Sequence, residues 1–319
     1  MSSRYKNLVM AGFSDGDLSQ DAWKQLQSLT EKTTLTSREG DDFAKALSAA
    51  DAVVLRLGAR FDSQMMSQSP NLKYIGMYGT GYGRIETAEA ARRSIVVTNV
   101  PDYSTEGVAE LAVAIILNHL RDLPRALKQT AANNYSDSDF MGRELASQTV
   151  GVVGLGNIGR RFASLVAEGF GSRVVYWSRS RRPNLEGPHL EYVDLPTLFS
   201  TADVISLHVA LAKDTDKLIG SELLSRMKDG ALLVNLSPME LIDFDALCQK
   251  LATNTIFLAL DHTDELSAEQ LKRLEANPAH CRLYPPIGYL TSESSARKEQ
   301  ILVKNVSAAL SGSPQNQVN

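Results

Sequence analysis

The sequence is poor in cysteine and has no long apolar run. Cys248 and Cys281 are the only cysteines among 319 residues, which argues against a disulfide framework and favours a reducing compartment. The longest apolar stretch, residues 111–117, is far shorter than the roughly 20 residues that span a membrane. The N-terminus lacks a signal-peptide pattern. We therefore expect a cytoplasmic protein that does not enter a membrane.

An excess of positive charge is also absent. The formal net charge is −4, so we expect no partnership with nucleic acid or an anionic membrane surface. The composition, 43% hydrophobic and 22% charged residues, is that of a globular protein. The length allows two domains of ordinary size.

The most informative stretch is residues 150–182. An apolar run at 150–153 leads into a G-x-G-x-x-G turn, an amphipathic segment follows, and a second apolar run occupies 174–177. Strand, glycine turn, helix and strand form the context in which this motif binds a dinucleotide. A glycine turn in a core βα unit without a ligand is the alternative.

Each residue of the turn has a physical role in that interpretation. Gly154 allows the tight turn, Gly156 lets backbone amides approach a pyrophosphate, and Gly159 lets the helix pack on the strand. The diphosphate would lie at the helix N-terminus, at Asn157 and Ile158, where backbone N–H groups of the first turn and the macrodipole favour an anion.

Further apolar runs alternate with helical patterns along the chain. They predict strands at residues 7–11, 51–57, 72–77, 95–100, 202–208, 231–235 and 255–261, a buried helix at 108–120 and a final helix at 294–309. The polar residues 129–139 predict a surface loop or partner contact, and 311–319 a polar tail. This alternation predicts an α/β fold with parallel sheets and ligands at the carboxyl ends of the strands.

Several segments together resemble the D-isomer-specific 2-hydroxyacid dehydrogenase family. They are ARRSIVVTNVPDYSTEGVAE (91–110), the run 142–159, ADVISLHVAL (202–211), LIG (218–220), MKDGALLVN (227–235) and NVSAALSG (305–312). The resemblance covers nearly the whole chain and implies two Rossmann-like domains with a deep cleft between them. Residues 1–100 plus 287–319 would form a flavodoxin-like substrate domain, and residues 101–286 the dinucleotide-binding domain. It also implies a homodimer, with the long helix after Ser104 near the interface.

The resemblance also implies binding residues. Backbone amides around Gly79, Thr80 and Gly81 would hold a substrate carboxylate, and a glycine-rich turn suits an anion on physical grounds too. Arg56 would contribute to the same substrate site. The positions at the ends of the nucleotide-domain strands, expected to contact the cofactor, are His208, Asn235 and Asp261.

The catalytic positions depart from the family pattern. Pro238 stands where V-N-x-x-R-G places an arginine, and Pro286 stands where T-P-H-x-G places a histidine. Counting five residues from Asp261 puts Leu266 at the family's glutamate, whereas a one-residue shift gives Glu265. Because proline has neither an ionisable proton nor a charge, we expect no turnover of simple 2-hydroxy or 2-oxo acids by the family mechanism.

Other residues are candidates for the missing groups. Arg84 and Arg56 could supply a cation, with a solvated or structural arginine as the alternative. The candidate proton donors, for which packing or structural roles are the alternative, are Tyr82, Tyr284, Tyr289 and His262. No cysteine or histidine spacing predicts a metal site.

The residues that follow the predicted strand at 174–177 favour NADP(H) over NAD(H) as the cofactor. Ser178 occupies the position of the aspartate that binds the adenosine ribose in most of the family, and Arg179, Ser180 and Arg181 follow it. Loss of the carboxylate removes repulsion against a 2′-phosphate, and hydroxyls and arginines supply charge-assisted hydrogen bonds. A solvated basic turn is the alternative.

Three functions remain open at this point. The first is an NADP(H)-dependent oxidoreductase with an altered active site, acting on a small, carboxylate-bearing molecule. The second is a catalytically inactive nucleotide-binding sensor or scaffold derived from a dehydrogenase. The third is a lyase or isomerase that uses the nucleotide structurally.

Overall fold

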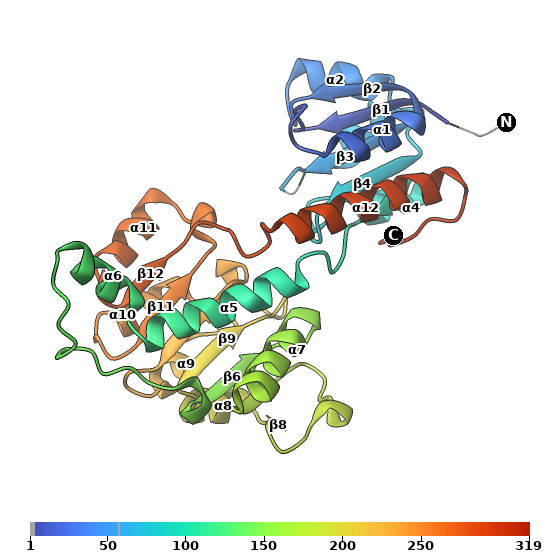
Figure 1. Ribbon diagram of the computed structural model, residues 1–319. Helices are drawn as coiled ribbons and strands as arrows, with labels where there is room; N and C mark the ends of the chain where they lie inside the picture. The colour runs from blue at the N-terminus through green and yellow to red at the C-terminus, as the bar shows by residue number, and fades with distance from the viewer. Residues whose placement is uncertain (1–3, 57) are drawn as a thin grey trace. The chain divides into compact units, whose positions relative to one another are not determined.

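The chain folds into two units, each built on a parallel sheet with helices on its faces (Figure 1). The computed structural model describes residues 4–56 and 58–319. The smaller unit contains the chain up to Tyr103 together with Ser292–Asn319, and the larger unit is Ser104–Thr291. The predicted α/β class with parallel sheets is confirmed.

The smaller unit has the strand order β2-β1-β3-β4-β5, with all pairs parallel. Alternate residues of β1 enter two apolar clusters, Val9 on one face of the sheet and Leu8 on the other. Helices therefore cover both faces, as in a doubly wound fold. Its strands are β1 (Tyr5–Ala11), β2 (Thr30–Thr36), β3 (Ala52–Arg56), β4 (Tyr74–Tyr78) and β5 (Val96–Thr98). Its helices are α1 (Gln20–Ser28), α2 (Asp41–Ser48), α3 (Ser63–Ser67), α4 (Thr87–Arg92) and α12 (Ser292–Leu310).

The polar tail after α12 pairs with the edge strand β5. The amide of Val318 donates to the carbonyl of Val97 at 2.9 Å, and the amide of Val97 donates to the Asn319 side chain at 2.9 Å. The tail thus covers polar backbone groups that an edge strand would otherwise expose.

The larger unit has the strand order β12-β11-β10-β9-β6-β7-β8, again all parallel. The order reverses between β6 and β9, and such a switch point opens a crevice for ligands at the carboxyl ends of the strands. The strands are β6 (Thr149–Val153), β7 (Arg173–Trp177), β8 (Leu190–Tyr192), β9 (Val204–Leu207), β10 (Leu232–Asn235), β11 (Phe257–Leu260) and β12 (Cys281–Leu283). The helices are α5 (Thr105–Leu120), α6 (Leu123–Ala131), α7 (Asn157–Ser164), α8 (Leu195–Thr201), α9 (Ser221–Arg226), α10 (Phe244–Leu251) and α11 (Ala268–Glu275).

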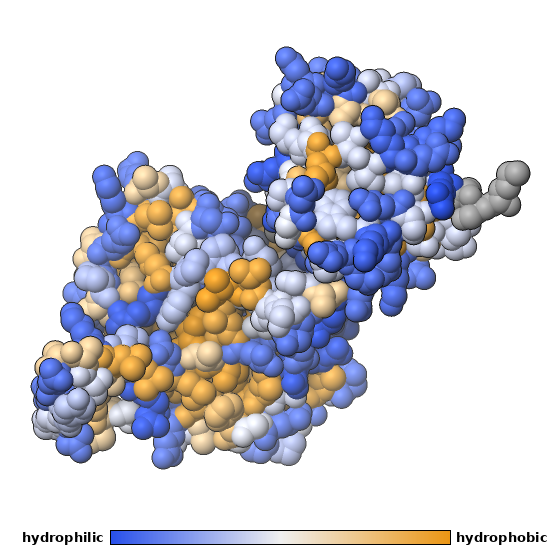
Figure 2. Space-filling model, turned by 45° about the horizontal axis from the view of Figure 1, so that its top comes forward, coloured by the Kyte–Doolittle hydropathy of each residue, from blue (hydrophilic) through white to orange (hydrophobic). Residues whose placement is uncertain are grey.

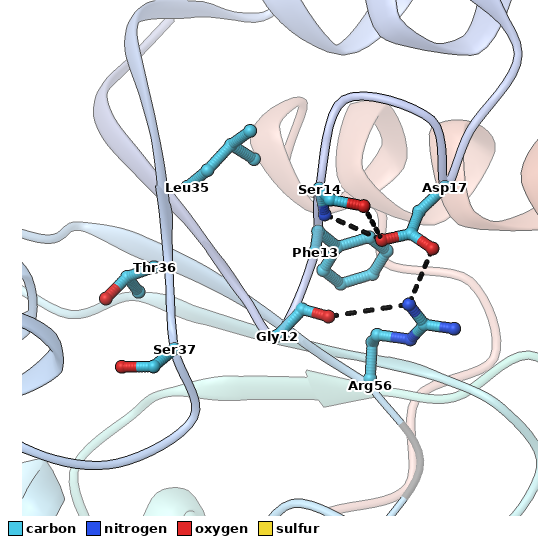
Figure 3. A pocket seen from close by; sticks show the side chains of 8 residues that line it. All are labelled: Gly12, Phe13, Ser14, Asp17, Leu35, Thr36, Ser37 and Arg56. Atoms are coloured by element: carbon cyan, nitrogen blue, oxygen red, sulfur yellow. Dashed lines mark hydrogen bonds and ion pairs between the residues drawn. The ribbon is translucent and has the colours of Figure 1, made fainter.

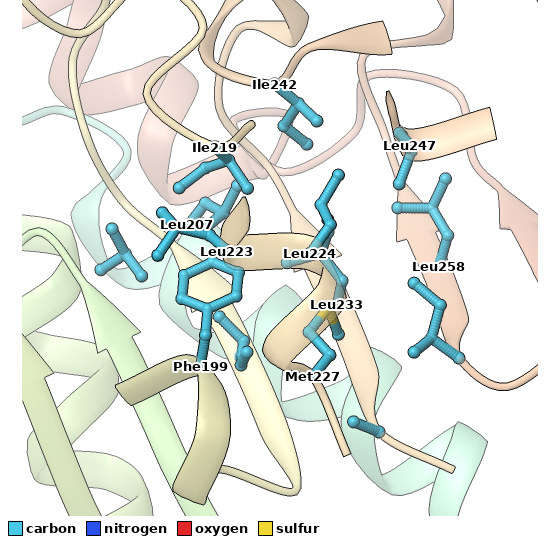
Figure 4. Packing of buried hydrophobic residues seen from close by; sticks show 14 of the residues in the cluster. Phe199, Leu207, Ile219, Leu223, Leu224, Met227, Leu233, Ile242, Leu247 and Leu258 are labelled. Carbon is cyan, nitrogen blue, oxygen red and sulfur yellow. The ribbon is translucent and has the colours of Figure 1, made fainter. Parts of the chain in front are cut away.

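Two apolar clusters hold this sheet, one on each face. Phe199, Leu224, Leu233 and Leu258 join α8, α9 and the sheet into one of them (Figure 4). On the other face α5 packs beside α7, and the predicted burial of α5 is seen in Ala112 and Ile116, which are fully buried. No helix in the described part of the chain is long and apolar enough to cross a membrane.

Candidate dinucleotide site and catalytic edge

The glycine turn joins β6 to α7, and two of its glycines are demanded by the fold itself. Gly154 has φ +97°, and a Cβ there would lie 2.6 Å from the carbonyl oxygen of His208. A Cβ on Gly159 would lie 2.0 Å from the carbonyl oxygen of Gly154. Any side chain at either position would therefore push α7 or the turn out of place.

Gly156 differs, because the protein itself does not require glycine there. It is the N-cap of α7 with φ −73° and ψ −165°, a conformation open to any residue, and an added Cβ would meet nothing within 4 Å. The open space lies at the first turn of α7, where backbone N–H groups lack intrahelical partners. The amides of Asn157 and Ile158 belong to this turn. The space fits an anionic group such as a diphosphate.

His208 lies against this turn as a neutral, partly buried ring. Its Nε2 is 2.9 Å from the Ser206 hydroxyl, and the ring packs against Phe162 with centroids 5.1 Å apart. Burial lowers the pKa of His208 to about 3. The ring thus supports the turn from below, and we assign His208 a role in shaping the site.

The carboxyl end of β7 carries Ser178 and the predicted basic residues. The Ser178 hydroxyl donates to the carbonyl of Ser180 at 2.7 Å, which curls the chain into a tight turn. Arg179 forms an ion pair with Asp214 at 2.8 Å, and both side chains are more than 60% exposed, at 69% and 63%. Exposed pairs of this kind contribute about 0–1 kcal/mol, so Arg179 can exchange Asp214 for another anion.

Arg181 has a different role from its neighbour Arg179. It donates two hydrogen bonds to Glu186 at 2.8 and 2.6 Å, and Glu186 also accepts one from the Tyr176 hydroxyl at 2.9 Å. The guanidinium also lies over the ring of Tyr192. Such a bidentate pair holds the segment after the turn in place. Arg181 is therefore engaged in structure, whereas Ser178 and Arg179 face outward.

The ends of β10 and β11 form the second part of the site. Asn235 is fully buried and its side chain accepts a hydrogen bond from the amide of Ser237 at 3.0 Å, which shapes the turn after β10. Asp261 follows β11, and its Oδ2 accepts from the amide of Gly288 at 3.4 Å. Its Oδ1 is buried without a hydrogen-bond partner among the described residues. Burial raises the pKa of this carboxyl. A buried carboxylate oxygen without a donor is costly and is an acceptor for a ligand.

His262 and Glu265 form a close pair beside Asp261. Nδ1 of His262 is 3.2 Å from Oε1 of Glu265, and Nε2 is 3.7 Å from Oδ1 of Asp261. Burial opposes the charged form of His262, but the hydrogen bond to Glu265 and the carboxylates of Asp261 and Asp264 outweigh it and raise its pKa. The pair can hold and move a proton near neutral pH.

The positions assigned to the family's catalytic groups lie around this pair. Pro238 precedes the 3₁₀ turn Met239–Leu241, and the amide of Met239 donates to Oε2 of Glu265 at 3.3 Å. Leu266 packs against the apolar core of the unit. Of Leu266 and Glu265, Glu265 is the one whose side chain contacts His262. Pro286 lies two residues after Tyr284, whose hydroxyl accepts a hydrogen bond from the side chain of Asn118 at 3.3 Å.

In the smaller unit, the loop Gly79, Thr80 and Gly81 follows β4. The carbonyl of Gly79 accepts from the amide of Val100 at 2.9 Å, and the carbonyl of Thr80 accepts from the side chain of Asn99 at 2.8 Å. The Thr80 hydroxyl donates to the carbonyl of Val100 at 3.0 Å. The loop is thus held in place through the carbonyls of Gly79 and Thr80 and the hydroxyl of Thr80. Tyr82, which comes directly after this loop in the sequence, is 38% exposed. The other candidate tyrosine, Tyr289, belongs to the larger unit and is 36% exposed.

The two arginines proposed as substitute cations already have partners. Arg56 ends β3, forms an ion pair with Asp17 at 2.7 Å and donates to the carbonyl of Gly12 at 3.5 Å (Figure 3). Arg84 donates to the carbonyl of Gly58 at 3.2 Å. Arg56 lines a hollow of about 490 Å³ at the carboxyl ends of β1, β2 and β3. The other lining residues are Gly12, Phe13, Ser14, Asp17, Leu35, Thr36 and Ser37.

Two features of the smaller unit were missed from the sequence. Asp17 lies in the loop after β1 and pairs with Arg56. The rule that ligands gather at the carboxyl ends of parallel strands is the signal that could have identified it. Lys298 of α12 lies over the rings of Tyr78 and Tyr103, 4.0 and 4.8 Å from their centroids. Burial and the charge of Arg56 lower the pKa of Lys298 to about 8. No local sequence pattern brings Lys298 to these tyrosines. Among the described residues no group of three or more histidine, cysteine or acidic side chains is arranged to hold a metal ion.

The chain is similar to dehydrogenases and reductases over most of its length. Residues 113–283 match the family model described as "D-isomer specific 2-hydroxyacid dehydrogenase, NAD binding domain". A glyoxylate reductase of Thermococcus litoralis is 36% identical over 84% of this chain and 83% of its own length. A hydroxypyruvate reductase of Thermotoga maritima is 32% identical over 88% of this chain and 92% of its own.

A solved structure supports the same relationship. The D-lactate dehydrogenase of Aquifex aeolicus, solved with NAD and lactic acid, is 28% identical, covers 96% of each chain and has a TM-score of 0.84. The matched family model lies within the larger unit, which carries the glycine turn and the switch point between β6 and β9. Because sequence, fold and nucleotide-binding turn agree, the chain belongs to the D-isomer-specific 2-hydroxyacid dehydrogenase family and has its NAD(P)-binding domain.

Proposed function

We propose that the protein is an NADP(H)-dependent oxidoreductase whose active site has been altered, so that it does not act on simple 2-hydroxy or 2-oxo acids by the family mechanism. The observation that carries the proposal is the open space at Gly156, at the N-terminus of a helix in a nucleotide-binding domain, where a diphosphate would fit. The catalytic positions occupied by Pro238 and Pro286 support the altered site.

Three groups of residues suit the parts of the dinucleotide. The amides at the start of α7 would hold the diphosphate, and Ser178, Ser180 and Arg179 would hold the 2′-phosphate of NADP(H). The buried Oδ1 of Asp261 would accept an N–H of the nicotinamide carboxamide. When bound, the reduced nicotinamide supplies a hydride.

Pro238 and Pro286 determine which hydride acceptors the site cannot reduce efficiently. A missing general acid costs about 10²–10⁴-fold in rate, and a missing electrostatic stabiliser about 10²–10³-fold. A 2-oxo acid needs both a cation for its carboxylate and a proton for its oxygen. The relatives are reductases of glyoxylate and hydroxypyruvate, which are small carboxylate-bearing molecules, and the loop at Gly79–Gly81 would hold such a carboxylate through backbone amides. We therefore propose a small carboxylate-bearing ligand whose binding does not depend on a guanidinium at position 238.

A nucleotide-binding sensor or scaffold without catalysis is the second candidate. It is favoured by the same two prolines, since drift after loss of activity would also remove catalytic groups. The two candidates differ in whether bound NADPH is oxidised when candidate acceptors are added. Oxidation supports the oxidoreductase, whereas NADPH that stays bound and reduced across a broad panel of carbonyl compounds supports the sensor.

The cofactor part of the proposal is tested by comparing NADPH with NADH. We expect NADPH to bind more tightly in a fluorescence titration, and Ser178→Asp to raise the NADPH dissociation constant about tenfold or more, because a carboxylate repels the 2′-phosphate. The matched control is Ser178→Asn, which has the same shape without the charge and should change the NADPH constant far less. Tighter binding of NADH by the unmodified protein would contradict the proposal.

A further inference from the structure

We propose that His262, oriented by Glu265, is the proton-transfer residue of the larger unit and replaces the histidine that Pro286 has displaced. The proposal rests on the proposed function as an NADP(H)-dependent oxidoreductase and narrows its substrate to a carbonyl compound. The acceptor carbon gains a hydride from NADPH, and the π electron pair of its C=O bond moves to the oxygen. That oxygen takes the proton from Nε2 of His262, which leaves an alcohol, NADP⁺ and a neutral imidazole.

The first argument is the orientation of the ring. His262 follows the end of β11, at the carboxyl edge of the sheet where ligands of such folds bind. Glu265 lies 3.2 Å from Nδ1 and so selects the tautomer that leaves a proton on Nδ1. Nε2 points toward the side of Asp261, at 3.7 Å from Oδ1. The side chain is 25% exposed, so a ligand can reach it.

The second argument is the connection of this pair to both altered positions. The amide of Met239, directly after Pro238, donates to Glu265 at 3.3 Å. The Thr263 hydroxyl donates to the carbonyl of Tyr284, two residues before Pro286, at 3.1 Å. The segments that lost the arginine and the histidine are thus both bonded to residues 261–265.

The third argument is charge. A protonated imidazole supplies both a positive charge and a proton, the two properties that the prolines lack. The charged groups that face His262 are all acidic: Asp261 beside Nε2, Glu265 at Nδ1, and Asp264 on the same turn. These carboxylates outweigh the effect of burial and raise the pKa of His262.

The fourth argument is the neighbouring orphan oxygen. Oδ1 of Asp261 has no hydrogen-bond partner among the described residues, and its side chain is only 4% exposed. A carboxamide N–H would satisfy it, which would bring the nicotinamide end of the cofactor to the side of the ring that Nε2 faces. A mere ion pair that closes the 3₁₀ turn Thr263–Glu265 would explain the Glu265 contact but not this arrangement.

The first test follows the titration of His262 by NMR. The chain has five histidines, so ¹³C-labelled imidazole signals are resolvable, and His262→Gln assigns the one of interest. We expect Glu265→Gln to lower its pKa by about one unit or more, and the control Asp264→Asn, which removes a charge without the hydrogen bond, to lower it less. We also expect a lower pKa with NADP⁺ than with NADPH, because the oxidised ring carries a positive charge.

The cofactor comparison separates two kinds of failure. 2′,5′-ADP, which lacks nicotinamide, should leave the pKa of His262 at its value in the free protein. Equal pKa values with NADP⁺ and NADPH, when fluorescence shows that both bind, would overturn the role of His262 but leave the proposed function standing. Absence of NADPH binding in the fluorescence titration would instead overturn the proposed function itself, and this inference with it.

The second test uses glyoxylate as a probe acceptor, with protein in excess over NADPH. We expect the rate of NADPH oxidation, already slow, to fall further as the pH rises through the pKa of His262, which gives the pH–rate profile a descending limb. Glu265→Gln should move that limb to lower pH. His262→Gln should slow the reaction about 10²–10⁴-fold and remove the limb, with NADPH affinity retained. A His262→Gln protein that keeps the original rate and limb would overturn the proposal.

Discussion

Gly156 and Gly220 are N-cap glycines with nearly the same backbone conformation, and they form a matched pair for testing whether a bound diphosphate requires Gly156. Gly156 starts α7 and Gly220 starts α9, both have extended backbone angles, and an added Cβ meets nothing within 4 Å at either. Side chains at both positions should therefore leave the fold intact. Only the one at Gly156 would enter the space that we assign to the diphosphate.

We predict that Gly156→Val raises the NADPH dissociation constant at least about 100-fold, because its side chain occupies the phosphate position. The control Gly220→Val should leave the constant unchanged, and both variants should melt within a few degrees of the original. Gly159→Ala, by contrast, should destabilise the protein, since its Cβ would lie 2.0 Å from a carbonyl oxygen. Retained NADPH binding in Gly156→Val would show that the turn does not hold a diphosphate.

Two partly buried histidines, His208 and His119, predict that stability falls at acid pH. Burial lowers the pKa of His208 to about 3 and of His119 to about 4, against an ordinary value of 6.5. Since both pKa values are depressed in the folded state, the stability they allow is complete above pH 6.5 and is lost as the pH falls below it. For each histidine, the free energy of unfolding should fall by about 1.4 kcal/mol per pH unit in that range.

The measurement is the free energy of unfolding in urea between pH 8 and pH 5. We expect His208→Gln to reduce the slope below pH 6.5 even though it lowers stability at pH 8. Leu233→Ala, a core truncation away from any titrating group, should lower stability by about 2–5 kcal/mol at every pH and leave the slope unchanged. A His208→Gln protein with the original slope would mean that the ring is not buried as a neutral group.

At the scale of elements, the central strands and the edge strand β5 were predicted from the sequence, whereas the edge strands β2, β8 and β12 were missed. The apolar runs that form β1, β3, β6 and β10 are buried on both faces of a sheet and so stand out in the sequence. Edge strands face water along one side. The missed strand β2 (TEKTTLT) is largely polar, with only Thr30 buried, and β8 and β12 have three residues each.

The candidate site was predictable to a similar extent. The glycine turn has a local pattern, so each of its residues could be named from sequence. The pairing of Arg181 with Glu186 and of His262 with Glu265 depends on turn geometry that spacing does not reveal. The sequence likewise left the choice between Leu266 and Glu265 open, because it does not reveal that Leu266 is partly buried against the core whereas Glu265 contacts His262.

At the scale of the whole molecule, apolar side chains gather on the surface of the larger unit (Figure 2). Helix α6 buries none of its residues. In α6 and the segment after it, Leu127 is 71% exposed, Tyr135 is 76% exposed and Met141 is 95% exposed. We propose that these exposed side chains contribute to the interface of the predicted homodimer, in addition to the long helix after Ser104.

If the protein forms the predicted homodimer, we expect Leu127→Glu combined with Met141→Glu to convert it to a monomer in light scattering after size-exclusion chromatography. Charges placed in an apolar interface must be desolvated without partners, which is strongly unfavourable. Leu35→Glu, at a 36% exposed position of the smaller unit, is the matched control and should remain dimeric. A double variant that stays dimeric would place the interface elsewhere.

The central claim is that a nucleotide-binding domain of this family has been kept beside a catalytic site that lost its arginine and histidine. It is tested most directly by the steady-state oxidation of NADPH by the purified protein with glyoxylate, hydroxypyruvate and pyruvate. Since a typical enzyme turns over about 10 times per second, we predict that NADPH binds but that turnover with each acid is at least about 100-fold slower than this. Turnover of any of the three acids at about 1–10³ per second would contradict the account.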